Sequence, residues 1–457
     1  MSKKSLITTV FFLPLISLFA AQPGRYFSGD YLLNVNNKPI DVYMVPMPEK
    51  CSGGIFDKLN WQPYSYATFV STGAVEVTVQ SALFDLSKVQ ILPKSKCVTP
   101  TKKTKSSTTF RMTAPMTLVL EPNGRHRALV ISANLPEKNA STTQNKHIKF
   151  FAPGYHLAGE IKLKSDETLY LAPGAWVEGY VQAFGKNINI CGSGVLSGSN
   201  YNWLKGPKKN MVLMSGEDIT VRDVTLFSAW SWTLNFNAAT NVLVDNVKIV
   251  CGRVINDDGI DVCRSKDVVI RNSFVRCQDD CLAVKWWCEN LVCTNMVFWG
   301  DAANIVRTGY ECESKQSSLI FKNHLIKDID ILHLTLNHRS VDNYWANCAF
   351  YLQASHGQTM SDLVFEDIRI NECCKEDIFI KACTMPIVGS ISSINFAEPG
   401  IMKNILFKNI KLPDSNGGMC IYLSSHDKEH PIENIRLENV SGYGPITKKG
   451  NVDFRVK

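Results

Sequence analysis

The stretch NDDGIDVCRSKDVVIRNSFVRCQDDCLAVK, residues 256–285, decides the fold and carries the chemistry. Asp258 lies in an NDDG turn, and the pair Asp279–Asp280 lies in a QDDC turn about one structural repeat later. The run between the two turns, KDVVIRNSFV, is short and rich in β-forming residues. A segment of this length is typical of one coil of a parallel β-helix, in which each coil stacks on the next.

Stacking of the coils would bring these acids together. Strands in a stack lie about 4.7–4.9 Å apart, so residues one coil apart become neighbours in space. Like charges at that distance raise each other's pKa, so one carboxyl can stay protonated while another is ionised. Hydrolysis of a glycosidic bond requires this division between an acid and a base.

Aspartate is also common at β-helix turns for structural reasons, because its side chain bonds to nearby backbone and tolerates left-handed geometry. We interpret Asp261, at the start of the following strand, in this way, and both readings stay open for Asp257. Structure alone gives no reason for three acids to converge from consecutive coils. We therefore predict that Asp258, Asp279 and Asp280 are catalytic.

A repeated pattern, an Asn or Asp followed by alternating aliphatic residues and another Asn or Asp, runs through the chain from about residue 147. Its aliphatic anchors recur every 23 to 26 residues at Ile219, Val242, Val268 and Leu291. Later anchors, at Leu363, Ile405 and Ile435, are spaced more widely, which indicates inserted loops. The period predicts an all-β chain whose main domain is a right-handed parallel β-helix.

The expected domain order follows from where this pattern is present. Residues 22–135 lack it and show alternating runs separated by Pro, Gly and Asn turns, which predicts an N-terminal β-sandwich. Such a module could cap the open end of the solenoid. We expect a polar linker at 136–146, the β-helix at 147–445 and a short C-terminal tail at 446–457.

The first 21 residues predict export. They combine two lysines, an apolar run and a small-residue end, which is typical of a signal peptide, so we expect a secreted or periplasmic protein. The rest of the chain has no run long and apolar enough for a membrane span. The net charge of +7 is spread over surface patches, and an exported chain without an aromatic-plus-basic module is not expected to bind nucleic acid.

The 15 cysteines are odd in number, and six of them cluster near the acids. Packing inside the solenoid is the favoured role, because free cysteine behaves as a small hydrophobe. A zinc site at Cys277 and Cys281 is disfavoured because no matching second pair follows. Since acid and base are both carboxyls, we expect neither a metal nor another cofactor.

The NDDG and QDDC motifs closely resemble those of glycoside hydrolase family 28, the polygalacturonases, which read NTDG and QDDC. Residues 168–201 also resemble the dextranases and isopullulanases of family 49. The resemblance implies an inverting hydrolase of a polysaccharide or oligosaccharide. It assigns Asp279 as the general acid and Asp258 and Asp280 as the groups that activate water.

The chain departs from the polygalacturonase pattern in the next coil. That coil reads WGDAANIVR, residues 299–307, and lacks the family's histidine, so Asp301 is expected to extend the acidic column. The family's uronate-gripping RIK motif is also missing, and Arg307 or Arg339 could replace it. We therefore expect a neutral or only partly charged glycan at the cleavage site. The candidate substrate-binding residues are Lys285, Asp301, Arg307 and Trp299.

Two other classes of protein share the expected fold. A β-helix polysaccharide lyase would use calcium-bound acids and a basic residue to abstract a proton. A carbohydrate-binding solenoid would have lost catalysis, against which the intact acids argue. A test for hydrolysis separates both from the glycosidase.

Overall fold

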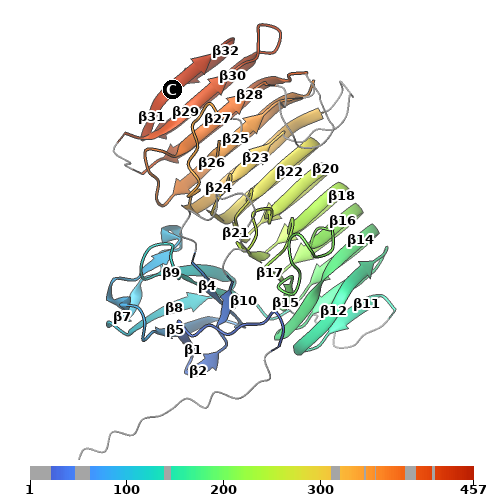
Figure 1. Cartoon of the computed structure of the whole chain (residues 1–457), viewed down its shortest axis with the longest axis vertical. Helices are drawn as coiled ribbons and strands as arrows, with labels where there is room; N and C mark the ends of the chain where they lie inside the picture. The colour runs from blue at the N-terminus through green and yellow to red at the C-terminus, as the bar shows by residue number, and fades with distance from the viewer. Residues whose placement is uncertain are drawn as a thin grey trace, which may run out of the picture.

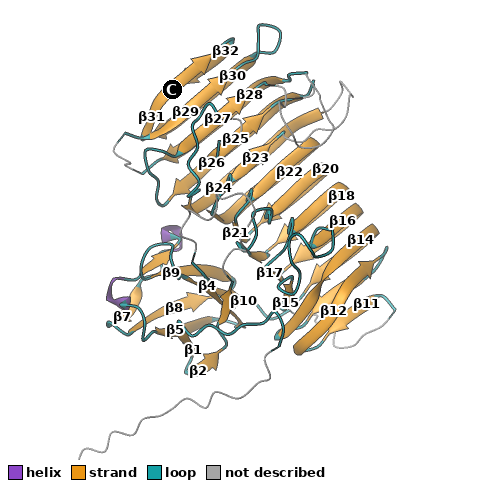
Figure 2. Ribbon diagram, viewed as in Figure 1, coloured by secondary structure: helices purple, strands orange, loops and turns teal. Residues whose placement is uncertain are grey.

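Strands make up most of the described part of the chain. The computed structural model describes residues 22–46, 62–137, 146–309, 320–343, 346–355, 357–385, 398–413 and 417–457. They form an N-terminal module beside a long stack of parallel strands (Figure 1). The helical elements with assigned bounds in these ranges are two short 3-10 turns, Leu86–Lys88 and Lys94–Lys96 (Figure 2). The expected signal peptide lies outside the described residues.

The N-terminal module consists of two five-stranded sheets that share one hydrophobic core. In strand order, the first sheet is β2 (Lys38–Ile40), β1 (Leu32–Val35), β5 (Ala74–Gln80), β8 (Ser107–Thr113) and β7 (Pro100–Lys103). The second is β3 (Tyr43–Val45), β4 (Tyr64–Val70), β10 (Leu129–Asn134), β9 (Met116–Glu121) and β6 (Gln90–Leu92). Alternation explains the core, because Val75, Val77 and Val79 of β5 are buried while their neighbours face outward.

The second body is a parallel β-helix of 22 strands, in which each strand pairs in parallel with strands of the adjacent coils. Its strands are β11 (Ile148–Phe151), β12 (Gly154–Leu163), β13 (Thr168–Leu171), β14 (Ala175–Cys191), β15 (Val195–Ser197), β16 (Val212–Arg222), β17 (Thr225–Phe227), β18 (Leu234–Asp245), β19 (Lys248–Val250), β20 (Ile260–Arg271), β21 (Phe274–Cys277), β22 (Leu282–Gly300), β23 (Val306–Thr308), β24 (Ile320–His333), β25 (Cys348–Gln353), β26 (Thr359–Ile370), β27 (Ile378–Cys383), β28 (Ile401–Lys411), β29 (Met419–Ser424), β30 (Ile432–Ser441), β31 (Tyr443–Lys449) and β32 (Val452–Val456).

The register of the strands follows the repeat in the sequence. Ile219 pairs with Val242, Val242 with Val268, and Val268 with Leu291, as the spacing of the anchors predicts. The next coil places His324 at the anchor position, between Leu291 and Leu363. This histidine is buried and its Nδ1 accepts a hydrogen bond from the Leu291 amide (3.2 Å), while burial lowers its pKa to about 3. The sequence pattern missed this coil because a polar residue occupies an aliphatic position.

The Asn and Asp residues of the repeat adopt left-handed backbone conformations at the bends between strands. Asp267 and Asn290, for example, have φ angles of 55° and 57°. Their side chains stack, and Asn290 Nδ2 donates to Asp267 Oδ1 at 2.7 Å. Short amide and carboxylate side chains tolerate this backbone region best among residues other than glycine, which is why the pattern requires them there.

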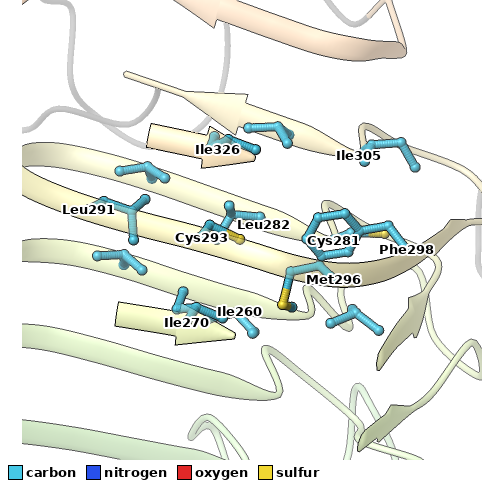
Figure 3. Close-up of a cluster of buried hydrophobic side chains, with 14 of the residues drawn as sticks. Ile260, Ile270, Cys281, Leu282, Leu291, Cys293, Met296, Phe298, Ile305 and Ile326 are labelled. Atoms are coloured by element: carbon cyan, nitrogen blue, oxygen red, sulfur yellow. The ribbon is translucent and has the colours of Figure 1, made fainter. Parts of the chain in front are cut away.

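The interior of the solenoid is filled by several buried side chains from each coil. Figure 3 shows Ile260, Leu282 and Ile305 with Cys281 and Cys293 among these buried side chains. All thirteen cysteines within the described ranges are free thiols, and most are buried. Their packing among aliphatic residues agrees with the role expected for small hydrophobic groups.

Two features of the domain order emerge from the structure. Residues 443–456 are not a tail: β31 and β32 pair with β29 and β30 and complete the last coil, because Ile446 and Phe454 continue the alternation of the repeat.

The N-terminal module packs on the side of the solenoid, where Tyr64 and Tyr66 meet Phe227 and Trp299 in a shared apolar cluster. No helix within the described ranges has the length and apolar character needed to cross a bilayer.

Candidate active site

The three acids converge at the turns that precede two stacked strands. Asp258 lies just before β20, and Asp279 and Asp280 lie between β21 and β22. Gly259 explains the close approach of the turns, because its amide donates to the Asp280 carbonyl at 2.8 Å and a Cβ there would lie 2.5 Å from the Cys281 carbonyl. One carboxylate oxygen from each acid lies within 4.8 Å of the others. The sequence offsets therefore do bring these side chains together.

Lys285 is the cation of this acidic patch. Its Nζ lies 3.2 Å from Asp258 Oδ2 and 3.0 Å from Asp261 Oδ1, and all three residues are buried. The ammonium also lies 3.5 Å from the centre of the Trp232 ring. The charge of Lys285 thus offsets that of Asp258, and the ion pair with Asp261 holds Lys285 in place. A charge buried with a partner is the arrangement that burial requires.

Asp280 is fixed by a residue that the sequence interpretation missed. Asn304 donates two hydrogen bonds to Asp280 Oδ1, from its backbone amide (3.1 Å) and from Nδ2 (2.7 Å). The side-chain oxygen of Asn304 in turn accepts from the Cys348 amide at 2.8 Å. These two bonds fix the orientation of the Asp280 carboxyl group. The sequence feature that could have identified Asn304 is its position about one coil after the acid pair.

Asp279 has a different environment from its two neighbours. It is half-buried, whereas Asp258 and Asp280 are buried, so it faces the solvent side of the patch. Its pKa is raised well above the ordinary value, first by burial and then by the negative charges of Asp258 and Asp280, against the opposing charge of Lys285. A carboxyl held protonated beside two anchored carboxyls can donate a proton.

Asp257 holds the turn in place through hydrogen bonds to backbone amides. Its two oxygens accept hydrogen bonds from the amides of Gly252 and Gln278, each at 2.7 Å, and it is completely buried. Burial raises its pKa to about 7 in spite of these bonds. The contacts give Asp257 the structural role of joining two coils beneath the acids.

Two arginines occupy distinct positions around the site. Arg339 lies in the segment between β24 and β25, where burial lowers its pKa and the negative charge of Asp279 opposes that effect. It is therefore within electrostatic reach of Asp279. Arg307 is buried on β23, where its guanidinium lies 3.6 Å from the centre of the Tyr351 ring and donates to Gln353 Oε1 at 2.9 Å.

Asp301 and Trp299, two of the expected substrate-binding residues, lie at the contact with the N-terminal module. Asp301 is 2% exposed and forms ion pairs with Arg125 (2.8 Å) and Arg276 (3.0 Å). Burial alone would raise its pKa, but the two arginines hold it below the ordinary value. Trp299 is buried against Tyr64 and donates to Asp301 at 3.0 Å. Trp299 near the end of β22 and Asp301 just after it both contact residues of the module.

The three acids are also placed close enough to hold a cation. Hard divalent ions such as calcium prefer carboxylate oxygens. The ammonium of Lys285, already 3.2 Å from Asp258, offsets negative charge at the same patch. Among the described residues, Lys285 pairs with Asp258 and Asn304 donates to Asp280, so these two acids each have a partner within the protein.

Comparison with known proteins agrees with the resemblance of the motifs. The family model described as glycosyl hydrolases family 28 matches residues 156–302, which include Asp258, Asp279 and Asp280. The chain is similar to family 28 over these coils. The match ends before Arg307 and Arg339, so it leaves the surroundings of the acids on that side unassigned.

Curated relatives include both kinds of enzyme that the motifs suggested. Exopolygalacturonase rpg16 of Rhizopus delemar is 28% identical over 65% of this chain and 74% of its own length. Isopullulanase of Aspergillus niger is 26% identical over 40% of this chain and 36% of its own length. The matches to the isopullulanase, to exopolygalacturonase rpg13 of Rhizopus delemar and to a polygalacturonase of Brassica napus cover between 31% and 53% of those proteins' lengths.

Among solved structures, Dex49A from Penicillium minioluteum is similar over 96% of both chains, with a TM-score of 0.64 and 16% sequence identity. At this identity the likeness concerns the fold. Because it extends over nearly the whole chain, the pairing of an N-terminal β-module with a parallel β-helix recurs in Dex49A.

Proposed function

We propose that this protein is a glycoside hydrolase that cleaves O-glycosidic bonds of a polysaccharide, with Asp279 as the general acid. The single observation that carries the proposal is the convergence of three acids, of which Asp279 is half-buried and its partners Asp258 and Asp280 are buried. Asp258, paired with Lys285, and Asp280, bonded to Asn304, are the groups that we assign to activate the water. The similarity to family 28 over the same coils supports this assignment.

We propose inversion at the anomeric carbon, with Asp258 and Asp280 sharing one water. The distance between the acids bears on this choice, and the configuration of the first product decides it. Inverting enzymes usually hold their carboxyls about 6.5–9.5 Å apart and retaining enzymes about 5–5.5 Å. The oxygens here lie within 4.8 Å of one another, so the separation by itself does not favour inversion. Proton NMR of the first product formed separates the two routes, because a retained anomer would make Asp258 or Asp280 a nucleophile.

The surroundings of the acids support an acidic glycan as the first candidate substrate. The expectation of a neutral glycan rested on Asp301 repelling a carboxylate, and Asp301 is neutralised by two arginines at the contact between modules. Arg339 lies instead within reach of Asp279. Arginine is the side chain best suited to bind a uronate carboxylate.

An α-glucan is the second candidate. The similarity to isopullulanase of Aspergillus niger favours it. The test uses the purified full chain against de-esterified polygalacturonate and against pullulan and dextran, with reducing ends as the readout. Arg339→Ala should lower kcat/KM on polygalacturonate and leave any α-glucan activity unchanged. Turnover of pullulan or dextran alone would select the second candidate, and unsaturated products would replace hydrolysis with lyase chemistry.

We also propose that the module of residues 22–135 is a β-sandwich and that the protein is exported. Two five-stranded sheets around a common core support the first point. The character of the first 21 residues supports the second. N-terminal sequencing of the mature protein recovered outside the cytoplasm tests the export, because the processed chain should begin near residue 22.

A further inference from the structure

A second cluster of metal-ligating side chains lies apart from the catalytic acids. His338, Cys374 and Asp377 each offer one ligand atom, and these atoms lie within 4.8 Å of one another. Cys374 Sγ is 3.8 Å from His338 Nε2, and His338 Nδ1 is 3.4 Å from Asp377 Oδ1. The three residues come from two segments, one between β24 and β25 and the other between β26 and β27.

The half of the cluster on residues 374–377 is held in place by its own turn. Asp377 Oδ2 accepts from the Cys374 amide at 2.7 Å, and the Asp377 amide donates to the Cys374 carbonyl at 3.1 Å. Asp377 then enters β27, and its carbonyl accepts from the Cys420 amide. The turn therefore presents a thiol and a carboxylate side by side toward His338.

One carboxylate oxygen in this turn points to a ligand. Asp377 is 4% exposed, and its buried Oδ1 accepts no hydrogen bond among the described residues, although His338 Nδ1 lies 3.4 Å away. A buried carboxylate oxygen without a donor is costly, and a bound cation would satisfy it. His338 and Cys374 are more exposed, so an ion could reach the cluster from solvent.

We propose that His338, Cys374 and Asp377 form a binding site for a divalent transition metal ion, with Zn²⁺ the best match. Imidazole nitrogen, thiolate sulfur and carboxylate oxygen together are the ligands of zinc, whereas calcium and magnesium prefer oxygen alone. Zinc with bonds of about 2.0 and 2.3 Å holds its nitrogen and sulfur ligands about 3.5 Å apart. The 3.8 Å between Cys374 and His338 requires little adjustment. Water takes the fourth position.

Binding would tie together two segments beside the acidic patch. Arg339 directly follows His338 and lies within electrostatic reach of Asp279. An ion at the cluster would therefore fix the segment that carries Arg339 to the turn before β27. The site is independent of the proposed glycosidase function, because none of its ligands is one of the three acids.

The test uses Co²⁺ as a coloured substitute for Zn²⁺ on the reduced, chelator-treated full chain. We expect saturable binding of one equivalent with a thiolate-to-cobalt charge-transfer band, which Zn²⁺ displaces. Cys374→Ser should abolish the band, and His338→Ala and Asp377→Asn should weaken binding by more than about 100-fold, since loss of an outer-shell partner alone costs about 10–100-fold. Cys373→Ser is the matched control, because Cys373 Sγ contacts the Pro413 carbonyl instead, and it should keep the band.

A second measurement needs no variant. Zn²⁺ should slow alkylation of Cys374 in the unmodified chain, read by mass spectrometry, while the exposed Cys97 reacts at an unchanged rate. Absence of a charge-transfer band, a band that survives Cys374→Ser, or equal alkylation of Cys374 with and without Zn²⁺ would each overturn the site. Co²⁺ binding that shows no charge-transfer band and is lost in Asp279→Asn would instead assign the ion to the acidic patch.

Discussion

Asp258 and Asp301 are buried to the same degree, each with 2% exposure, yet their surroundings oppose one another. Asp258 has two acids within 4.8 Å and shares Lys285 with Asp261. Asp301 forms ion pairs with two arginines, Arg125 and Arg276. The first patch holds an excess of negative charge and the second an excess of positive charge.

This contrast shows that the balance of charges, and not burial, separates a reactive acid from a structural one. Burial raises the pKa of both Asp279 and Asp301. Neighbouring carboxylates raise it further at Asp279, whereas the guanidinium groups reverse the effect at Asp301. Asp279 is left with a proton to give, and Asp301 is left as a permanent anion that joins two modules.

The largest expected effect comes from removing the proton donor. Asp279→Asn keeps the shape of the side chain but cannot donate, so turnover should fall by about 10²–10⁴-fold. The measurement is kcat on whichever polysaccharide the substrate panel selects. Asp267→Asn, at an exposed bend of β20, is the matched control and should keep full activity. Comparable activity of the two variants would remove Asp279 from the mechanism.

Breaking the contact at Asp301 should affect stability before catalysis. Asp301→Ala leaves the buried Arg276 and the partly buried Arg125 without their carboxylate, and the loss of one partner of a buried ion pair costs about 3–5 kcal/mol of unfolding free energy. Denaturant unfolding measures it. Because the pKa of Asp301 is lowered in the folded state, this contribution is present above its unfolded pKa and is lost as the pH falls through the folded value. A variant that unfolds like the wild type but loses turnover would return Asp301 to the substrate site.

Lys285 links the acids of the first patch, so its removal should move the pH profile. Its positive charge lowers the pKa of Asp279 and pairs with Asp258. In Lys285→Met both carboxyls should hold their protons to higher pH, and both limbs of the kcat/KM profile should shift upward. Lys285→Arg keeps the charge and should restore the limbs toward the wild type. An unchanged profile in Lys285→Met would show that Lys285 has only a packing role.

The smallest effect concerns stability at the acidic patch. The raised pKa of Asp279 means that its ionised form is disfavoured in the folded state, so its contribution to stability is present below its unfolded pKa and is lost as the pH rises through the folded value. Asp279→Asn should therefore raise Tm at neutral pH and leave it unchanged in acid. Calorimetry at the two pH values checks this. A lower Tm at neutral pH would mean that the ionised carboxylate has a stabilising partner.

Much of the fold was predictable because the repeat is local. The anchors at Ile219, Val242 and Val268 lie in the register that their spacing predicted, since each coil stacks its aliphatic positions on those of the coil before it. The coil at His324 was missed because a buried histidine occupies the aliphatic position. Residues after 445 were taken for a tail because charged residues hide the alternation of β31 and β32.

By itself, the sequence determined the stacked coils and the convergence of Asp258, Asp279 and Asp280, because both depend on spacing along a regular repeat. Only the tertiary structure decided that Asp301 and Trp299 face the N-terminal module and that Asn304 fixes Asp280. It also placed His338 beside Cys374 and Asp377, which come from different loops. The physical reason is that spacing fixes which coil a residue belongs to, whereas the partner across the solenoid surface depends on loops and modules that no repeat encodes.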